Sequence, residues 1–151
     1  MHVKTRQHRL RVRYQETDQM GVVYHANYLN WMEIGRTEWI RAEGLPYRRL
    51  EERGLLLPVV DLQVSYRHPA RYDDIVEVHT RVTGYSRVKL EFEYEIWRVD
   101  GAEESGEERS VLLLTGLTRH IWMNASWKPC RIDKEAPELY AILVESGGRD
   151  I

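Results

Sequence analysis

The chain of 151 residues contains a single cysteine, Cys130, so it has no intramolecular disulfide. Such a chain relies on a hydrophobic core, and the scarcity of cysteine favours a reducing compartment. No apolar run approaches the roughly 20 residues that a membrane-spanning helix needs. The formal net charge of -2 argues against nucleic acid or an anionic membrane as a partner. The basic N-terminus lacks the apolar segment of a secretory signal, so we expect a cytoplasmic protein.

Several signatures of common enzyme chemistry are also missing. No set of Cys and His residues has the spacing of a zinc site. There is no Gly-rich phosphate loop and no Gly-x-Ser-x-Gly nucleophile turn. The acidic pair Asp73 and Asp74 is best interpreted as a solvated turn. We therefore expect no metal and no cofactor.

What the sequence does contain is a clear pattern of half-buried strands. Hydrophobic residues make up 42% and charged residues 30%, which indicates a single globular domain over residues 1–151. Apolar and polar residues alternate with period two in four segments, as in strands with one face in the core. A fifth segment is apolar on both faces, so we expect it to be central or covered by a partner chain. The five segments are residues 8–14, 60–66, 76–82, 88–97 and 109–123.

The connections between these segments favour an antiparallel sheet. Residues 83–86 read as a short hairpin between two alternating runs. Asp100 and Gly101 open a longer acidic loop that ends near Glu108. Sequential hairpins of this kind predict an antiparallel sheet of about five strands.

One early segment has helical rather than strand periodicity. Over residues 27–43, apolar or small residues recur at helical spacing, and Gly44 and Pro46 predict where the helix ends. Gly35 lies in the middle of this helix, where it costs about 1 kcal/mol relative to alanine. We interpret it as a point where another element approaches closely. Shorter helices are expected at 47–53 and 135–144.

Together these elements predict an α+β architecture in which the sheet curls around one long central helix. A single helix covers only part of a five-stranded sheet. Trp97, Trp122 and Trp127 suggest further apolar surface. We therefore expect at least a homodimer.

The stretch before the helix carries the strongest functional signal. It reads DQMGVVYHANY from Asp18 to Tyr28, and is followed by GRTEWIRAEG at 35–44 and YRHPARYDDIVEVHTRV at 66–82. In this order and spacing, the motifs resemble those of the hotdog-fold acyl-CoA thioesterases, in the branch of the 4-hydroxybenzoyl-CoA thioesterases and YbgC/FadM-like proteins. The resemblance covers roughly residues 8 to 123 and implies a hotdog fold. It does not indicate which acyl group the substrate carries.

The resemblance also implies a reaction and a site. An acyl-CoA thioester would be hydrolysed to a free acid and coenzyme A, with coenzyme A entering as part of the substrate. The backbone N–H at His25, at the helix N-terminus, would stabilise the oxyanion. Asp18 would either attack the carbonyl directly or activate a water molecule. The family implies a homodimer or homotetramer with the active site at the dimer interface.

Each of these residues has a simpler structural interpretation. Asp18 suits a loop carboxylate that caps the turn before Gly21, and Gly21 suits a backbone conformation that other residues avoid or a close approach to substrate. The His25 ring either assists chemistry or only packs. Tyr24 is interpreted as a wall of the acyl pocket, and Asn27 as the helix N-cap.

The remaining predicted substrate contacts also have a simpler structural interpretation. Val23 is expected to contact substrate, and Arg67, Arg87 and Lys89 to meet the phosphates of coenzyme A, although a solvated surface charge is the simpler role for each. Two other functions stay open. One is a non-catalytic module that binds acyl thioesters, and the other is a thioesterase acting on acyl groups carried by an acyl-carrier protein.

Overall fold

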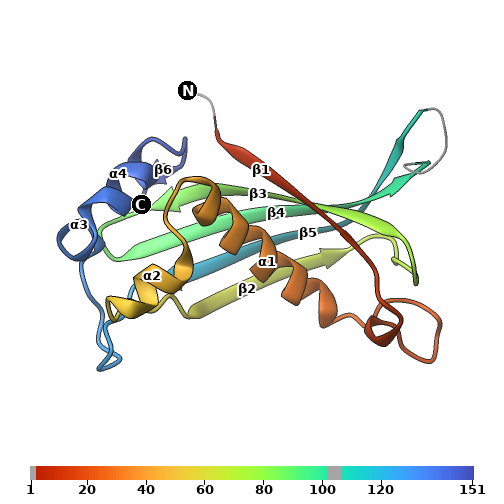
Figure 1. Ribbon diagram of the computed structural model, residues 1–151, viewed down its shortest axis with the longest axis horizontal. Helices are drawn as coiled ribbons and strands as arrows, with labels where there is room; N and C mark the ends of the chain where they lie inside the picture. Colours follow the sequence, from red (N-terminus) through yellow and green to blue (C-terminus); the bar gives the residue numbers. More distant parts are fainter. Residues whose placement is uncertain (1–2, 102–106) are drawn as a thin grey trace.

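In the computed structural model, which describes residues 3–101 and 107–151, one long helix lies across a twisted sheet (Figure 1). The strands are β1 (Thr5–Arg11), β2 (Val59–Tyr66), β3 (Ile75–Tyr85), β4 (Lys89–Asp100), β5 (Arg109–Ile121) and the two-residue β6 (Arg149–Asp150). The helices are α1 (Asn27–Ala42), α2 (Tyr47–Glu52), α3 (Ile132–Glu135) and α4 (Pro137–Val144), preceded by a 3-10 turn, η1 (Tyr14–Glu16).

The five long strands form one antiparallel sheet in the order β1-β3-β4-β5-β2. β6 adds a short parallel pairing, in which Gly84 lies opposite Arg149. The predicted antiparallel sheet is confirmed. β5 lies between β4 and β2, so the strand with two apolar faces is internal, as its sequence predicted.

Helix α1 crosses one face of the sheet, where it packs on β1, β3 and β4, and its Met32 side chain reaches Gly116 of β5 (Figure 1). In β3 and β4 alternate residues are buried beneath it, which confirms the period-two interpretation for these two strands, whereas β1 has only half-buried and exposed residues. In β3 and β4 the buried set is Val76, Val78, Thr80, Val82, Leu90, Phe92, Tyr94 and Ile96.

Gly35 lies where α1 comes closest to β3. A methyl group added there would lie 2.4 Å from Thr80 Oγ1 and 2.8 Å from Val78 Cγ1, closer than real contacts allow. The predicted close approach is therefore confirmed. The helix can lie this close to the sheet only because residue 35 has no side chain.

Strand β2 differs from the prediction of a half-buried strand. Val60 and Leu62 are 51% and 41% exposed. Leu62 lies opposite the buried Thr118, so it faces the side of the sheet that α1 covers elsewhere. The contacts that α1 makes with the sheet are mainly with β1, β3 and β4, so among the described residues Val60 and Leu62 stay largely exposed.

The N-terminal and hairpin boundaries also shifted from the prediction. The first strand ends at Arg11, and Tyr14 lies in η1 with 76% of its surface exposed, so it is not part of the buried face. β3 continues to Tyr85, and the turn falls after it, where Ser86 Oγ accepts a hydrogen bond from the Lys89 N–H at 2.9 Å. A register shift after Val82 accommodates the longer strand.

The predicted helices are confirmed with two local corrections. α1 begins at Asn27, but the cap position is Ala26, so Asn27 is not the N-cap. The C-terminal helix is divided into α3 and α4, because Pro137 cannot continue α3 and instead begins α4. The centre of the predicted acidic loop, residues 102–106, lies outside the described residues.

We expect Gly35→Ala to destabilise the protein by about 1–3 kcal/mol, although alanine is the better helix former, because the methyl group overpacks the contact with β3. Urea unfolding measures the change. In a Gly35→Ala/Thr80→Ala protein, removal of the closest atom should recover part of the loss. Equal or higher stability of Gly35→Ala alone would contradict the role of this contact.

Candidate active site

The segment between η1 and α1 folds into a tight loop around Asp18. Thr17 and Val23 pair across its base as an isolated antiparallel bridge. The Asp18 N–H donates to the Val22 carbonyl at 2.9 Å, and Asp18 Oδ1 accepts from the Met20 N–H at 2.8 Å. Gly21 has a φ of +79° with nothing near its missing side chain, so it supplies the backbone conformation of the turn rather than a close contact.

Asp18 therefore has the structural role that its sequence context suggested, and it keeps one oxygen unused. Among the described residues, no group donates a hydrogen bond to Asp18 Oδ2. The carboxylate lies near the first turn of α1. Burial is the main reason that the pKa of Tyr28 is raised, and the negative charge of Asp18 raises it further.

His25 is held at the start of α1 through its backbone. The hydroxyl of Tyr66, at the end of β2, donates to the His25 carbonyl at 2.7 Å. The His25 ring is exposed and packs on Tyr24, with ring centroids 4.5 Å apart. Within the described residues no group accepts a hydrogen bond from the His25 N–H, and the cap residue Ala26 offers no side-chain acceptor. The Asn27 N–H donates to the Tyr24 carbonyl at 2.9 Å, so the His25 N–H is the donor that this helix end leaves available near the Asp18 loop.

Glu16 is a buried carboxylate that the sequence interpretation missed. One oxygen accepts from Trp31 Nε1 and the other from the Arg13 N–H, each at 2.8 Å. Its backbone carbonyl accepts from Tyr24 N–H at 2.9 Å and from Asn27 Nδ2 at 2.8 Å. Glu16 thus joins η1, the Asp18 loop and α1, so the place of Asp18 beside the helix depends on it. The spacing of Glu16 to Trp31 gives no signal of this in the sequence.

The other residues predicted near the acyl group lie at the same end of the molecule. Tyr24 is 47% exposed and is free to form a wall of a pocket. Val23 is 3% exposed and belongs to the core, and its N–H donates to the Ala70 carbonyl at 2.8 Å. That bond and the Ala70 N–H donating to the Tyr28 hydroxyl at 2.9 Å bring the loop after β2 against the site.

The three predicted phosphate contacts are separated by the fold. Arg67 lies in the loop after β2, at the end of the sheet where Asp18 lies. Arg87 lies in the turn between β3 and β4, and Lys89 is the first residue of β4, so both are at the other end of β3. Since β3 has 11 residues, the two ends are about 35 Å apart. Within one chain, only Arg67 is brought to the candidate site.

Comparison with known proteins identifies the family. The model of the thioesterase superfamily matches residues 20–105. The chain is 40% identical over 139 residues to YneP of Bacillus subtilis (strain 168), named as an acyl-CoA thioesterase, covering 91% of this chain and 93% of that protein. It belongs to the thioesterase superfamily.

Two further relatives agree with this assignment. Acyl-CoA thioesterase YbgC of Haemophilus influenzae is 38% identical over 90 residues, which cover 59% of this chain and 66% of that protein. The solved structure of a DHNA-CoA thioesterase from Staphylococcus aureus aligns with a TM-score of 0.83 and 35% identity, over 93% of this chain and 89% of that one. The fold is the hotdog fold, and the chain is a thioester hydrolase, as the motifs implied.

Two further properties of the thioesterase concern the described residues only. None of their helices is long and apolar enough to cross a membrane. No group of three or more His, Cys, Asp or Glu side chains among them is arranged to hold a metal ion. Neither finding tests the predicted compartment or the predicted lack of a cofactor.

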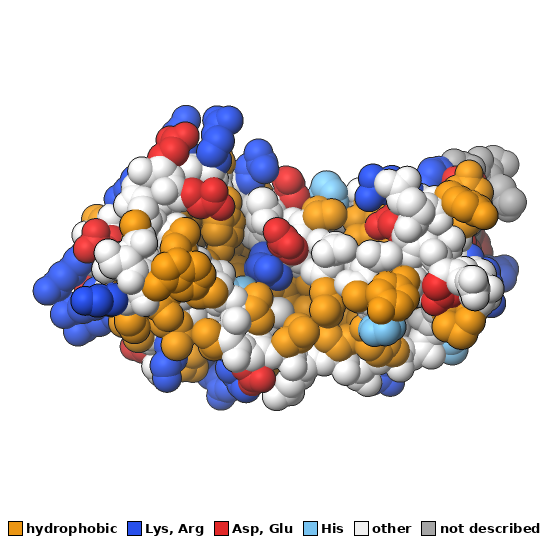
Figure 2. Space-filling model, turned by 90° about the horizontal axis from the view of Figure 1, so that it is seen from below, with side chains coloured by type: hydrophobic (Ala, Val, Ile, Leu, Met, Phe, Trp, Pro, Cys, Tyr) orange, Lys and Arg blue, Asp and Glu red, His pale blue; other side chains and the backbone are white. Residues whose placement is uncertain are grey.

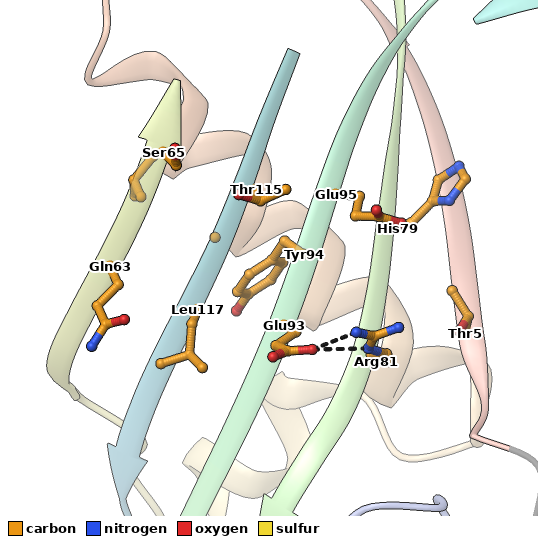
Figure 3. Close-up of a pocket in the computed structure, with 12 residues that line it drawn as sticks. Thr5, Gln63, Ser65, His79, Arg81, Glu93, Tyr94, Glu95, Thr115 and Leu117 are labelled. Atoms are coloured by element: carbon orange, nitrogen blue, oxygen red, sulfur yellow. Dashed lines mark hydrogen bonds and ion pairs between the residues drawn. The ribbon is translucent and has the colours of Figure 1, made fainter. Parts of the chain in front are cut away.

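A hollow of about 460 Å³ lies on the sheet face opposite α1 (Figure 3). Its lining mixes polar and apolar side chains from neighbouring strands, with Arg81 on β3 bonded to Glu93 on β4 at 3.1 Å. None of the predicted site residues lines it.

A second hollow, of about 450 Å³, lies among α1, α2 and the segment that leads into β2. Leu57 and Pro58 form one wall, Tyr47 another, and Trp127 and Arg36 complete it. We call this second hollow the Arg36 cavity. Figure 2 shows the molecule from below, with hydrophobic side chains spread over a hollowed face and charged side chains among them.

A chain of buried polar groups runs inward from the Arg36 cavity. Burial raises the pKa of Tyr94, and the nearby positive charge of Arg36 opposes this shift. The Tyr94 hydroxyl lies 2.7 Å from Thr118 Oγ1. Thr118 Oγ1 lies 2.8 Å from His120 Nε2, and His120 Nδ1 lies 3.3 Å from the Leu57 carbonyl. Since a carbonyl only accepts, Nδ1–H donates to Leu57, and a neutral His120 accepts from Thr118. Thr118 then accepts from Tyr94.

His120 makes stability depend on pH. Burial and the positive charge of Arg36 lower the pKa of His120 to about 4, from about 6.5 in the unfolded chain. Between these values the unfolded state binds more protons, so stability should fall as pH decreases from 6.5 to 4, by at most about 3 kcal/mol from this residue. Urea unfolding at pH 7 and pH 4.5 measures the change.

The matched control is His120→Gln, which keeps a polar side chain that does not titrate. Its stability should depend less on pH across this interval than that of the natural protein. An identical pH dependence in both proteins would show that His120 does not become protonated on unfolding.

Proposed function

We propose that this thioesterase hydrolyses acyl-CoA to a free acid and coenzyme A, with Asp18 driving the reaction and the His25 N–H holding the oxyanion. The observation that carries the proposal is the open N-terminus of α1 beside a carboxylate that is fixed through only one of its oxygens. The proposal also keeps the predicted cytoplasmic location and the absence of a cofactor.

The chemistry follows from these two groups. As the thioester carbonyl is attacked, negative charge develops on its oxygen, and unpaired N–H groups at the positive end of a helix stabilise that charge. Asp18 either attacks the carbonyl carbon, forming a mixed anhydride that water then cleaves, or takes a proton from an attacking water molecule. In both routes the carbon–sulfur bond breaks and coenzyme A leaves as the thiolate. The side chain of His25 and the ring of Tyr24 would border the acyl group.

The proposal includes a homodimer or homotetramer whose subunits share the active site. β2 is an edge strand with one pairing partner, β5, among the described strands. It carries Val60, Leu62 and Tyr66, which are 51%, 41% and 48% exposed. An unpaired strand edge with exposed apolar side chains is normally covered. A second copy of β2 would pair with this edge and bury these side chains. It would also cover the face that α1 leaves open.

We expect Asp18→Asn to lower kcat for acyl-CoA hydrolysis by roughly 10²- to 10⁴-fold, since the amide is neither a base nor a nucleophile. The Asn side chain can still accept from the Met20 N–H, so the turn and the fold should persist. A thiol-release assay over short, medium, long and aromatic acyl-CoAs measures the loss, and Asp150→Asn, an exposed residue in β6, is the control.

The same assay separates the three functions. Binding without turnover in the natural protein would support a non-catalytic module, and turnover limited to acyl-carrier-protein substrates would support the carrier-protein class. Equal turnover by Asp18→Asn and the natural protein would remove Asp18 from the mechanism.

We expect light scattering after size exclusion to give two or four times the 18.0 kDa mass of one chain. Leu62→Glu places a charge on the exposed apolar face of β2 and should shift the protein toward monomer with a loss of activity. Gln63→Glu, on the other face of the same strand, should leave the dimer contact intact. A fully active 18.0 kDa monomer would contradict the shared site.

A further inference from the structure

We propose that the Arg36 cavity binds the far end of the acyl group, that Arg36 donates a hydrogen bond to an oxygen carried there, and that each cavity serves the Asp18 loop of a second copy. The substrate class is thus an acyl-CoA whose acyl group bears an uncharged oxygen, such as a hydroxyl, at its far end. This inference rests on the proposed function and adds to it the residue that sets specificity.

The first step concerns the unused donors of Arg36. A guanidinium has five N–H donors and accepts none. One interaction goes to the Tyr94 hydroxyl. Among the described residues, no carboxylate lies within 4.0 Å of it. Since Arg36 lines the cavity, its remaining donors are available to a ligand that accepts hydrogen bonds.

The second step concerns what surrounds these donors. Tyr94 and Thr118, which continue the polar chain, are buried and neutral. Their hydroxyls already bond each other at 2.7 Å, so they hold Arg36 in place rather than compete for it. The exposed carboxylates of Glu33 and Glu51 also line the cavity. Two acidic groups beside one Arg disfavour a third negative charge, so a hydroxyl fits better than a carboxylate.

The third step concerns the walls. Leu57, Pro58 and Tyr47 give an apolar lining, and a volume of about 450 Å³ lies within the range of small-molecule sites. Trp127 is 65% exposed and has a φ of +58°, which is uncommon for a residue with a side chain. Its turn is held by Asn124, whose Oδ1 accepts from the Lys128 N–H at 3.1 Å. The strained turn keeps an aromatic ring at the edge of the cavity.

The fourth step places the cavity relative to the Asp18 loop. Leu57 and Pro58 immediately precede the first residue of β2, whereas Tyr66, which holds His25, is its last residue. The 8 residues of β2 separate the two ends by about 25 Å. Two copies of an edge strand related by a two-fold axis pair antiparallel. The Arg36 cavity of one copy would then lie beside the His25 end of the other.

The test compares matched substrates that differ by one oxygen: hexanoyl-, octanoyl- and decanoyl-CoA against their ω-hydroxy forms. We expect the natural protein to prefer the hydroxylated member of at least one pair by roughly tenfold or more in kcat/KM. In Arg36→Met this ratio should fall to about one, because the donor that distinguishes the two substrates of a pair is gone. The ratio is taken within one preparation, so a partial loss of folding cancels, and Arg36→Gln carries the same expectation.

The control is Arg41→Met, an exposed position of α1 outside the cavity, which should keep the natural ratio. An unchanged ratio in Arg36→Met, or no preference in the natural protein, would overturn the role of Arg36. If no acyl-CoA is hydrolysed, the proposed function fails instead. Calorimetric binding of the same pairs to Asp18→Asn, with and without Arg36→Met, then gives the Kd ratio that decides the role of Arg36.

Mixed dimers test whether the cavity serves the other copy. Chains carrying Asp18→Asn and chains carrying Arg36→Met are co-expressed with different tags, and the heterodimer is purified. If the cavity acts across the interface, one of its two sites combines an intact Asp18 with an intact Arg36, and the natural preference for the hydroxylated substrate returns. If the cavity acts within its own chain, the preference stays absent, and the shared arrangement is wrong.

Discussion

The contact between α1 and β3 at Gly35 is the constraint on which the rest of the structure depends. It allows the helix backbone to lie against Thr80 and Val78. This position carries the N-terminus of α1 to the loop that contains Asp18. The contacts of α1 with the sheet are mainly with β1, β3 and β4, and Val60 and Leu62 of β2 stay largely exposed. The exposed side chains of β2 and the position of the candidate site therefore both follow from how α1 packs on the sheet.

The site itself is held by groups that take no part in the proposed chemistry. Glu16 accepts hydrogen bonds from Trp31 and from the backbone of Arg13, and Tyr66 fixes the carbonyl of His25. These bonds order a loop that has few apolar contacts of its own. A carboxylate and a helix end remain close together without bonding each other, which leaves both free for a substrate.

The position of Arg36 has a similar logic. Its neighbour Tyr94 and the Thr118 that bonds Tyr94 lie on strands distant in sequence, and Arg36 lines a cavity that the Asp18 loop of its own chain does not border. A polar group this well supported, with donors left over, is typical of a surface shaped for a ligand rather than for stability alone.

The sequence by itself determined the strands, the long helix, the close approach at Gly35 and the family, because periodicity, glycine and an ordered motif are local signals. It also placed Asp18 and His25 beside a helix start. Only the tertiary structure decided that β2 is uncovered, that Glu16 and His120 are buried, and that Arg87 and Lys89 lie far from Asp18 in the same chain. These outcomes depend on which strands the helix crosses and on the order of strands in the sheet. A local stretch of sequence contains no information about either arrangement.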